Sequence, residues 1–591
     1  MYGKLRHIFK YCWQSSRVRR DARGGGLTLA ISRREFIQFA SVASTLFLGK
    51  PLKALAVQQK LQIEDILQFK SKGKLTILHF TDIHGQLKPI YYRPPSENYG
   101  VGDFEGIPPH LVGEQFLSHF NISRNSPLAY AHTMVDYLTL AREYGKMGGL
   151  DKMATLINAI RDERGADNVL LLDGGDTWQG SYTSLMSQGM DMVSTVNMLK
   201  PDAMVGHWEF TFGKDRLAEL LEEMNYPFLG GNVFDTEWEE QVFESTAFFE
   251  RAGSKIAVIG QHFPYTPIAN PQYLVEGWSF GIRLSNIQKN VNLAKKAGAQ
   301  VVILLSHNGF DVDQKLAGMV EGIDVILTGH THDAIPHAIR INDTLLLSSG
   351  SHGKYLGRID LDIQNGKIKD WNSSLMPVFS DAIPSEKSVS KHIDEVRAPY
   401  ESECKRIIGQ SADLLYRRGN FNGSWDDVIC DAIIENRDVE ISLSPGFRWG
   451  TTLLPGQDIT IEDLYNQTSM NYPEVYRREI TGKDLKLILE DVCDNLFNPD
   501  PFYQQGGDMV RVGGMTYQCS PKNKMGNRIS DMRLVSNGNL IEENKKYVVG
   551  GWGSVNEGVE GPAIYDIVEE YIKNKGTISS KSGSIVKVLG M

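Results

Sequence analysis

Aspartate and histidine residues recur in this sequence directly after short apolar runs. They form five motifs, which are Asp82-Ile83-His84, Asp173-Gly174-Gly175-Asp176, Gly206-His207-Trp208-Glu209, Ser306-His307-Asn308-Gly309 and Gly329-His330-Thr331-His332. Alternate residues of an extended turn face the same side, so Asp-x-His and His-x-His can each supply two ligands. A mixed set of carboxylate oxygens and imidazole nitrogens suits manganese, iron or zinc better than calcium. The motifs therefore predict a metal centre.

The number of these motifs matters more than any one of them. A single histidine after a strand is usually a hydrogen-bonded structural residue, but five such motifs in one chain are harder to explain in that way. Two metals about 3.5–4 Å apart could share Asp176 and activate a bridging water in line with a leaving group. We therefore expect hydrolytic chemistry.

The elements that must position these residues are apolar, β-rich runs that end at polar or glycine-containing turns. They cover residues 75–81, 169–172, 203–205, 256–259, 301–305 and 325–327. Helical patterns at 149–160 and 214–224 lie between some of them. Strands that alternate with helices, and strands that are apolar throughout, predict a layered α/β domain with a buried sheet. Ligands in such domains bind at the strand ends.

A chain of 591 residues exceeds the size of one hydrophobic core, so we expect at least two domains. The metal-binding domain is predicted over 57–376, with a proline- and glycine-rich insertion at 91–144 near the mouth of the site. A polar linker with a helix at 388–404 covers 377–406, and a second domain covers 407–591. The net charge of −10 argues against a nucleic-acid partner.

The N-terminus predicts export. Ser32-Arg33-Arg34-Glu35-Phe36-Ile37 precedes an apolar run at 39–48 and then Ala54-Leu55-Ala56, which is typical of a twin-arginine signal peptide over residues 1–56. The run is shorter than the ~20 residues that span a bilayer, although a short anchor helix with a basic flank is an alternative. We expect a periplasmic protein without stable membrane insertion.

Four cysteines fall in the last third of the chain, at Cys404, Cys430, Cys493 and Cys519. An oxidising compartment would allow disulfides among them, with three complete pairings possible. Free buried thiols are equally compatible with the sequence.

The motif series resembles the calcineurin-like metallophosphoesterases and, more narrowly, the two-domain periplasmic 5'-nucleotidases. The resemblance covers nearly the whole mature chain and implies a second α/β domain of the 5'-nucleotidase type. It implies one metal held by Asp82, His84, Asp176 and His332, and a second held by Asp176, His207, His307 and His330.

The resemblance also implies a substrate-binding arginine in the second domain. Ser444-Pro445-Gly446-Phe447-Arg448, followed by Asp458-Ile459-Thr460, is similar to the segment that presents it. Arg448 would hold the anionic group that is attacked, because a guanidinium offers paired donors to a tetrahedral oxyanion. A surface salt bridge is the alternative role.

Several positions depart from the nucleotidase pattern. His207 replaces an asparagine ligand, Trp208 replaces the histidine that stabilises the transition state, and Thr211 replaces the aspartate partner of that histidine. Asn471 and Met509, or residues close to them, occupy the positions of the two phenylalanines that stack on the base. A purine would therefore lack its stacking platform.

The departures resemble the thiosulfohydrolases of the bacterial sulfur-oxidation (Sox) system. That likeness implies two Mn²⁺ ions per chain, although the ligands would also accept zinc or iron. It implies that a hydroxide held by both metals removes the terminal sulfonate, as sulfate, from a thiosulfonated cysteine on the arm of the SoxYZ carrier. Trp208 would line the channel for the arm, or else pack in the core.

Two other functions share these features. A periplasmic 5'-nucleotidase or related phosphoesterase would use all the same ligands, but it would lack the base clamp and the histidine–aspartate pair. A carrier-binding protein with a decayed site is the third possibility. It is disfavoured because every expected ligand position holds a residue that can bind metal.

Overall fold

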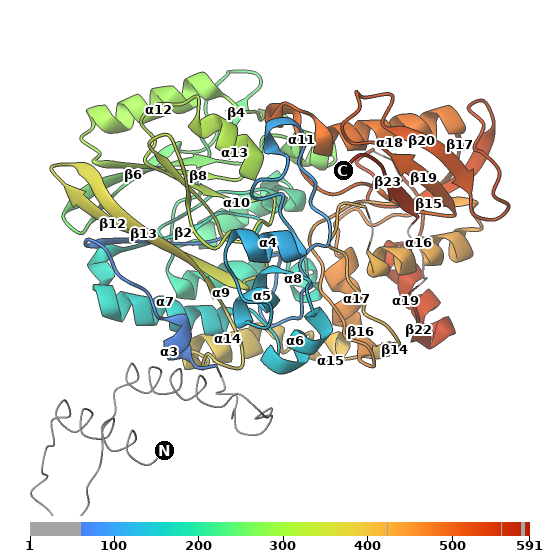
Figure 1. Ribbon diagram of the computed structural model, residues 1–591, viewed down its shortest axis with the longest axis horizontal. Helices are drawn as coiled ribbons and strands as arrows, with labels where there is room; N and C mark the ends of the chain where they lie inside the picture. Colours follow the sequence, from blue (N-terminus) through green and yellow to red (C-terminus); the bar gives the residue numbers. More distant parts are fainter. Residues whose placement is uncertain (1–60, 422, 557, 581–584) are drawn as a thin grey trace, which may run out of the picture. The chain divides into compact units, whose positions relative to one another are not determined.

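The computed structural model describes residues 61–421, 423–556, 558–580 and 585–591, and residues 61–591 form one compact unit (Figure 1). The predicted signal peptide at 1–56 lies outside the described residues. In the described part of the chain, no helix is both long enough and apolar enough to cross a membrane.

The first domain contains two mixed sheets, and the strands that precede the predicted ligands pair in parallel within each of them. The first has the order β13-β12-β1-β2-β3, formed by Lys367–Pro377, Tyr355–Gln364, Leu75–Phe80, Val169–Asp173 and Ala203–Met204. The second has the order β10-β11-β9-β8-β6-β5, formed by Ile339–Ile341, Thr344–Ser348, Val325–Thr328, Val301–Ser306, Ser254–Gln261 and Thr246–Arg251. In β1, β2, β8 and β9 every residue is buried, which explains why these strands read as uninterrupted apolar runs.

The two sheets share one core and are covered by helices on their outer faces. Ile77 and Leu170 of the first sheet belong to the same buried cluster as Ile303 and Val325 of the second. Helices α7 (Leu150–Arg164) and α9 (Met190–Leu199) cover the first sheet, and α12 (Leu284–Lys296) and α13 (Phe310–Ala317) cover the second. Figure 1 shows these helices on opposite sides of the sheets. The predicted layered α/β domain is confirmed.

The insertion at 91–144 forms three short helices with a small core of their own. They are α4 (Gly113–His119), α5 (Pro127–His132) and α6 (Tyr137–Tyr144). Buried residues such as Tyr130 and Leu140 pack with Leu375 and Phe379 of the first domain.

The segment at 377–406 is folded onto the first domain. It contains α14 (Lys387–Arg397) and α15 (Glu401–Cys404), where the sequence suggested one helix. Helix α14 packs against α7 and α9, and its Val389 and Ile393 are buried in their core. Most of the segment at 377–406 therefore packs with the first domain, and the chain passes to the second domain only near the end of this segment.

The second domain is also α/β. Its four-stranded sheet has the order β17-β21-β15-β18, formed by Tyr476–Thr481, Lys546–Gly551, Ile441–Ser444 and Arg511–Gly513. Two three-stranded sheets accompany it, β16-β14-β22 (Asp458–Thr460, Ile407–Ser411, Thr577–Ile578) and β20-β19-β23 (Ile529–Leu534, Met515–Cys519, Val586–Val588). The main helices are α16 (Ser424–Arg437), α17 (Ile461–Thr468), α18 (Gly482–Phe497) and α19 (Ile564–Lys575).

Candidate metal centre

The predicted ligands all follow the carboxyl ends of parallel strands. Asp82 and His84 follow β1, Asp176 follows β2, and His207 follows β3. The second sheet supplies the others, with His307 after β8 and both His330 and His332 after β9. Because these strand ends meet at one edge of the paired sheets, the seven side chains converge although they lie far apart in the sequence.

The backbone at these ligands is unusual. Five of the seven have a positive φ, namely Asp82 (53°), His84 (52°), Asp176 (58°), His330 (76°) and His332 (60°). The left-handed conformation costs a residue with a Cβ roughly 1–2 kcal/mol. Such residues cluster at functional sites, where the surrounding structure holds them in place.

The side chains form two adjoining groups. One contains His207, His307 and His330, and the other contains Asp82, His84, Asp176 and His332; within each group the ligand atoms lie within 4.8 Å of one another. Asp176 Oδ2 faces both groups, at 3.4 Å from His84 Nε2, 3.2 Å from His207 Nδ1 and 3.8 Å from His307 Nε2. The carboxylate of Asp176 is therefore placed to bridge two ions.

Several side-chain atoms of the predicted ligands lack the hydrogen-bond partners that buried polar atoms normally have. Asp176 Oδ1, His207 Nε2, His307 Nε2 and His332 Nδ1 are buried without a hydrogen bond. His84 Nε2 and His332 Nε2 face each other at 3.0 Å. Buried polar atoms without protein partners require an explanation, and a role as metal ligands is one.

Burial also sets the protonation of these groups. It is the main cause that lowers the pKa of the histidine ligands, as it does for His84 and His332, and it therefore leaves their imidazoles neutral with a free lone pair. Burial raises the pKa of Asp82 to about 6 and that of Asp176 well above its ordinary value. Neutral imidazoles together with buried carboxyl groups fit two divalent cations.

Glu209 ties two of the ligand loops together. Its buried carboxylate accepts hydrogen bonds from the backbone N–H groups of His207 (2.7 Å), Thr177 (2.6 Å), Trp178 (3.2 Å) and Asp176 (3.2 Å). These bonds join the loop after β2 to the loop after β3. Sequence reasoning missed this role, and the only signal was an acidic residue two positions after a ligand.

Two further histidines support the ligand loops. His262 Nδ1 accepts the backbone N–H of Gly206 at 2.7 Å, next to His207. The ring of His352 lies 5.5 Å from that of His84 and 5.7 Å from that of His332, between centroids. His337 instead contacts the Ser373 carbonyl at 3.1 Å.

Arg448 reaches the metal-binding loops from the second domain. Its Nη1 donates to the Thr331 carbonyl at 3.1 Å, between the ligands His330 and His332, and its Nε lies 3.3 Å from Asp508 Oδ1. Arg418 repeats this arrangement, with Nη1 3.0 Å from Asp508 Oδ1. The side chain of Arg448 is 11% exposed, so a surface salt bridge does not describe it.

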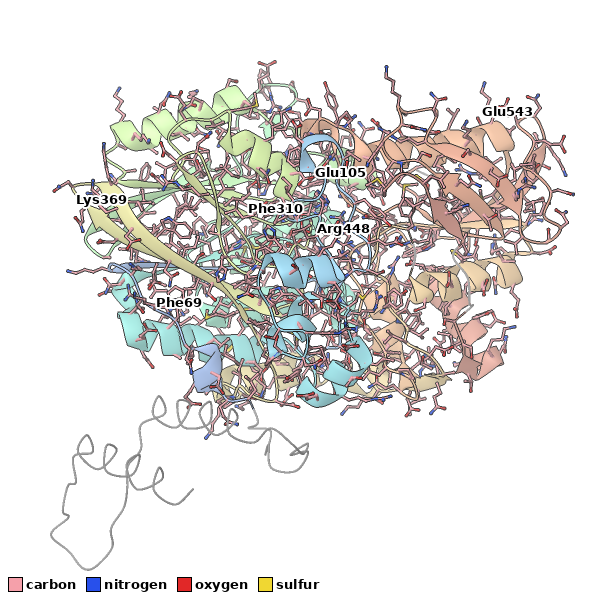
Figure 2. All side chains as sticks on the ribbon, in the orientation of Figure 1. Phe69, Glu105, Phe310, Lys369, Arg448 and Glu543 are labelled. Carbon is pink, nitrogen blue, oxygen red and sulfur yellow. The ribbon has the colours of Figure 1, made fainter. Side chains whose placement is uncertain are left out.

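Arg418 and Asp508 were not found from the sequence. Burial by itself would raise the pKa of Asp508, but the positive charges of Arg418, Arg448 and Arg511 lower it by more. The pKa therefore lies below its ordinary value, and the carboxylate stays ionised. Asp508 thereby fixes the two arginines beside the metal-binding loops. Figure 2 labels Arg448, which lies among residues of both domains.

The two groups of ligands open into a cavity of about 250 Å³, called here the site cavity. His84, Asp176 and His207 line it on one side, and Arg448 and Phe447 line it on the other. Glycines 446, 506 and 507 also border it.

Trp208 borders the site cavity and is also packed in a core. Its indole lines the site cavity and packs edge-on against Phe447, with ring centroids 5.6 Å apart. The residue is 6% exposed and belongs to a buried cluster of the second domain.

The two positions assigned to the missing base clamp do not border the site cavity. The Asn471 side chain donates to the Thr211 carbonyl at 2.8 Å, and Met509 is completely buried.

Two families match the chain. Residues 75–334 match the calcineurin-like phosphoesterases, and residues 408–567 match the C-terminal domain of 5'-nucleotidases. Among curated proteins, human 5'-nucleotidase is 25% identical over 323 residues, which cover 49% of this chain and 55% of the relative. The mouse protein is 24% identical over 323 residues, or 49% of this chain and 54% of the relative. The chain spans about half the length of these curated relatives.

Solved structures resemble this chain over more of its length. Thermus thermophilus sulfate thiohydrolase SoxB is 34% identical, has a TM-score of 0.86, and is matched over 88% of this chain and 98% of its own. A 5'-nucleotidase precursor, also from Thermus thermophilus, shares the fold at 18% identity, with a TM-score of 0.69 and coverage of 88% and 99%. The chain therefore belongs to the SoxB family, which combines a calcineurin-like phosphoesterase domain with a 5'-nucleotidase C-terminal domain.

Proposed function

We propose that this protein is a thiosulfohydrolase that removes the terminal sulfonate, as sulfate, from a thiosulfonated cysteine on the SoxYZ carrier. The observation that carries the proposal is the likeness to a sulfate thiohydrolase, at 34% identity over 98% of that chain. The buried Asp/His groups and Arg448 support a metal-dependent hydrolase that acts on an anionic group.

In the proposed reaction, the metal ligands and Arg448 have different roles. Two divalent metals, when bound to the seven ligands, would supply Lewis acidity and lower the pKa of a water molecule. Arg448 holds the sulfonate oxygens, because its guanidinium lies at the ligand loops and borders the site cavity. Water forms a bond to the outer sulfur, and the S–S bond breaks with its electron pair on the inner sulfur. The products are sulfate and a carrier persulfide, with the protons of water released to solvent.

Trp208 is better suited to this perthiolate leaving group than to the alkoxide leaving group of a phosphate ester. A perthiolate leaves as a stable anion and needs less help from a general acid than an alkoxide does. An indole at this position can neither donate a proton to the leaving group nor change its own charge. The edge of Trp208 against Phe447 instead gives the site cavity an apolar wall for sulfur.

The site cavity also fits an extended arm from a carrier. Its border contains Gly446, Gly506 and Gly507. Gly446 and Gly506 allow a close approach of neighbouring groups, because a Cβ atom there would lie 2.2 Å from the Asp508 carbonyl oxygen and 2.1 Å from His330 Nε2. Both domains line it, so an arm would contact the metal-binding loops and Arg448 at the same time.

A periplasmic 5'-nucleotidase is the second candidate. The shared fold and the match of residues 408–567 to the nucleotidase C-terminal domain favour it. The contact of Asn471 with Thr211 and the complete burial of Met509 disfavour it, since neither residue offers an aromatic face to a base.

A comparison of two substrates tests the proposal. Metal-loaded protein is given thiosulfonated SoxYZ and, separately, adenosine monophosphate, and the release of sulfate and of phosphate is measured. We expect sulfate release, with Arg448→Lys slower by about 100-fold at unchanged metal content, because lysine lacks the paired donors that stabilise an oxyanion. Arg340→Lys, a change at a side chain 58% exposed, is the control. Phosphate release without sulfate release would favour the nucleotidase.

We also propose that the bound metal is manganese and that the protein is located in the periplasm. The ligand set is compatible with two Mn²⁺ ions, and the twin-arginine pattern at Arg33 and Arg34 supports export. Elemental analysis of protein isolated from its native compartment tests the metal. Comparison of the export of the native chain with that of an Arg33→Lys/Arg34→Lys double variant tests the signal.

A further inference from the structure

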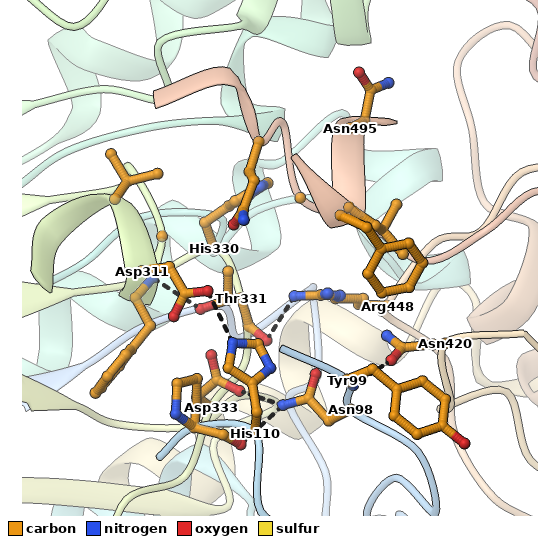
Figure 3. A pocket seen from close by; sticks show the side chains of 18 of the residues that line it. Asn98, Tyr99, His110, Asp311, His330, Thr331, Asp333, Asn420, Arg448 and Asn495 are labelled. Carbon is orange, nitrogen blue, oxygen red and sulfur yellow. Dashed lines mark hydrogen bonds and ion pairs between the residues drawn. The ribbon is translucent and has the colours of Figure 1, made fainter. Parts of the chain in front are cut away.

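A second cavity, called here the side chamber, lies beside the site cavity and has a volume of about 40 Å³ (Figure 3). Three parts of the chain enclose it, at Asn98 and His110 of the insertion, Asp311 and Thr331 of the first domain, and Asn420 and Leu496 of the second domain. A water molecule needs roughly 10–15 Å³ measured in this way, so the chamber can hold several waters or one small anion.

The side chamber and the site cavity share a wall. His330, Arg448, Asn495 and Gly506 line both of them. An anion held by Arg448 therefore has the site cavity on one side and the side chamber on the other.

Polar and apolar groups both line the side chamber, and its charged side chains are of both signs. His110 Nε2 lies 2.8 Å from Asp311 Oδ2, while its Nδ1 is buried without a partner. Asn98 Nδ2 donates to the Pro109 carbonyl at 2.9 Å and lies 3.4 Å from Asp333 Oδ1. Figure 3 shows these groups around the same space as Arg448. The basic side chains of Arg448 and His110 beside the carboxylates of Asp311 and Asp333 would let an anion pass without holding it tightly.

We propose that the side chamber is the exit for sulfate while the carrier is still bound. This inference rests on the proposed function. The sulfonate is the end of the substrate nearest the metal ligands and Arg448, so the carrier arm would fill the site cavity behind it. Sulfate formed beside Arg448 could not leave through the site cavity, because the carrier arm would block it. The side chamber lies on the other side of the wall that contains Arg448.

Variants that fill the side chamber test whether sulfate leaves through it. Gln504 and Leu496 line the side chamber but not the site cavity, so Gln504→Trp and Leu496→Trp fill it from two positions. Tyr503→Trp is the matched control, because Tyr503 adjoins Gln504 but is 65% exposed and lines neither space. Each metal-loaded variant is given thiosulfonated carrier, and acid-quenched sulfate is measured in the first turnover and in the steady state.

We expect both plugged variants to form sulfate at the wild-type rate in the first turnover. Their steady-state rate should fall roughly tenfold, because product release would become limiting. The Tyr503→Trp protein should match wild type in both phases. An unchanged steady-state rate in the plugged variants, or an equally slowed first turnover, would overturn the exit. Absence of sulfate from wild type in the first turnover would instead overturn the proposed function and the exit with it.

A second measurement needs no variant. If sulfate leaves while the carrier is still bound, it is the first product released, and added sulfate should inhibit wild-type protein without competing with the thiosulfonated carrier. Purely competitive inhibition would show that sulfate leaves only after the carrier and would contradict the exit.

Discussion

Asp176 lies between the two groups of predicted metal ligands. Its Oδ2 atom faces His84 of one group and His207 and His307 of the other, and its Oδ1 atom is buried without a partner. The sequence indicated this residue because it follows an apolar strand in an Asp-Gly-Gly-Asp turn. Glu209, Arg418 and Asp508 could not be found in that way, since their roles depend on contacts between distant segments.

Removal of the shared carboxylate should empty both metal sites. In Asp176→Ala we expect both ions to be lost and turnover to fall more than about 100-fold, because even the partners of metal ligands contribute 10–100-fold. Elemental analysis checks the metal content. Asp343→Ala, at a side chain that is 100% exposed, is the control. Full metal content in the Asp176 variant would contradict the bridging role.

Metal affinity should rise with pH between about 5 and 7. Burial raises the pKa of Asp82 from 3.8 to about 6, so below that pH its carboxyl is protonated in the metal-free folded protein. A metal ion must displace this proton, whereas the buried histidines, whose pKa values are lowered, are already neutral. The dissociation constant, measured by calorimetry at several pH values, should fall across this range. A constant value would contradict proton competition at Asp82.

At the scale of elements, the parallel strands carry the site. Strands β1, β2, β8 and β9 are buried throughout, so their apolar runs were visible in the sequence and their ends marked the ligands. The packing of α14 was not visible, because most of its surface is polar and only residues such as Val389 and Ile393 face the core. The helices of the insertion were not predicted either, since its prolines and glycines interrupt the helical pattern.

Glu209 is expected to hold the loops after β2 and β3 in register. In Glu209→Gln the amide NH₂ would face backbone N–H groups that now donate to a carboxylate. We expect the free energy of unfolding to fall by about 3 kcal/mol, because hydrogen bonds to charged groups contribute about 1.5–3 kcal/mol each. Denaturant unfolding and metal titration check this. Glu239→Gln, at an exposed position, is the control, and equal stability and metal affinity in both variants would contradict the role.

Among the four described cysteines, one pair is placed to form a disulfide. Cys493 Sγ of α18 and Cys519 Sγ of β19 lie 3.5 Å apart, and both residues are completely buried. In protein isolated from an oxidising compartment we expect this bridge, with Cys404 and Cys430 remaining thiols. Alkylation after unfolding without reductant, followed by peptide mass analysis, checks the pairing. Alkylation of all four cysteines would contradict it.

At the scale of the whole molecule, both domains contribute to the candidate site. The first domain supplies the seven predicted ligands, and the second supplies Arg448, Asp508 and the glycines beside the site cavity. The resemblance in sequence predicted both domains, and the match to SoxB over 98% of its chain confirms that membership. The side chamber could not be predicted, because three segments far apart in the sequence enclose it.

The central claim is that water attacks the outer sulfur of a carrier-bound thiosulfonate. Its most direct test is a single turnover of the metal-loaded protein in water enriched in heavy oxygen, with thiosulfonated SoxYZ as substrate and mass analysis of both products. We expect sulfate that carries a single oxygen atom from solvent, and a carrier that retains one sulfur as a persulfide. Sulfate without solvent oxygen, or a carrier that returns as a plain thiol, would contradict the account.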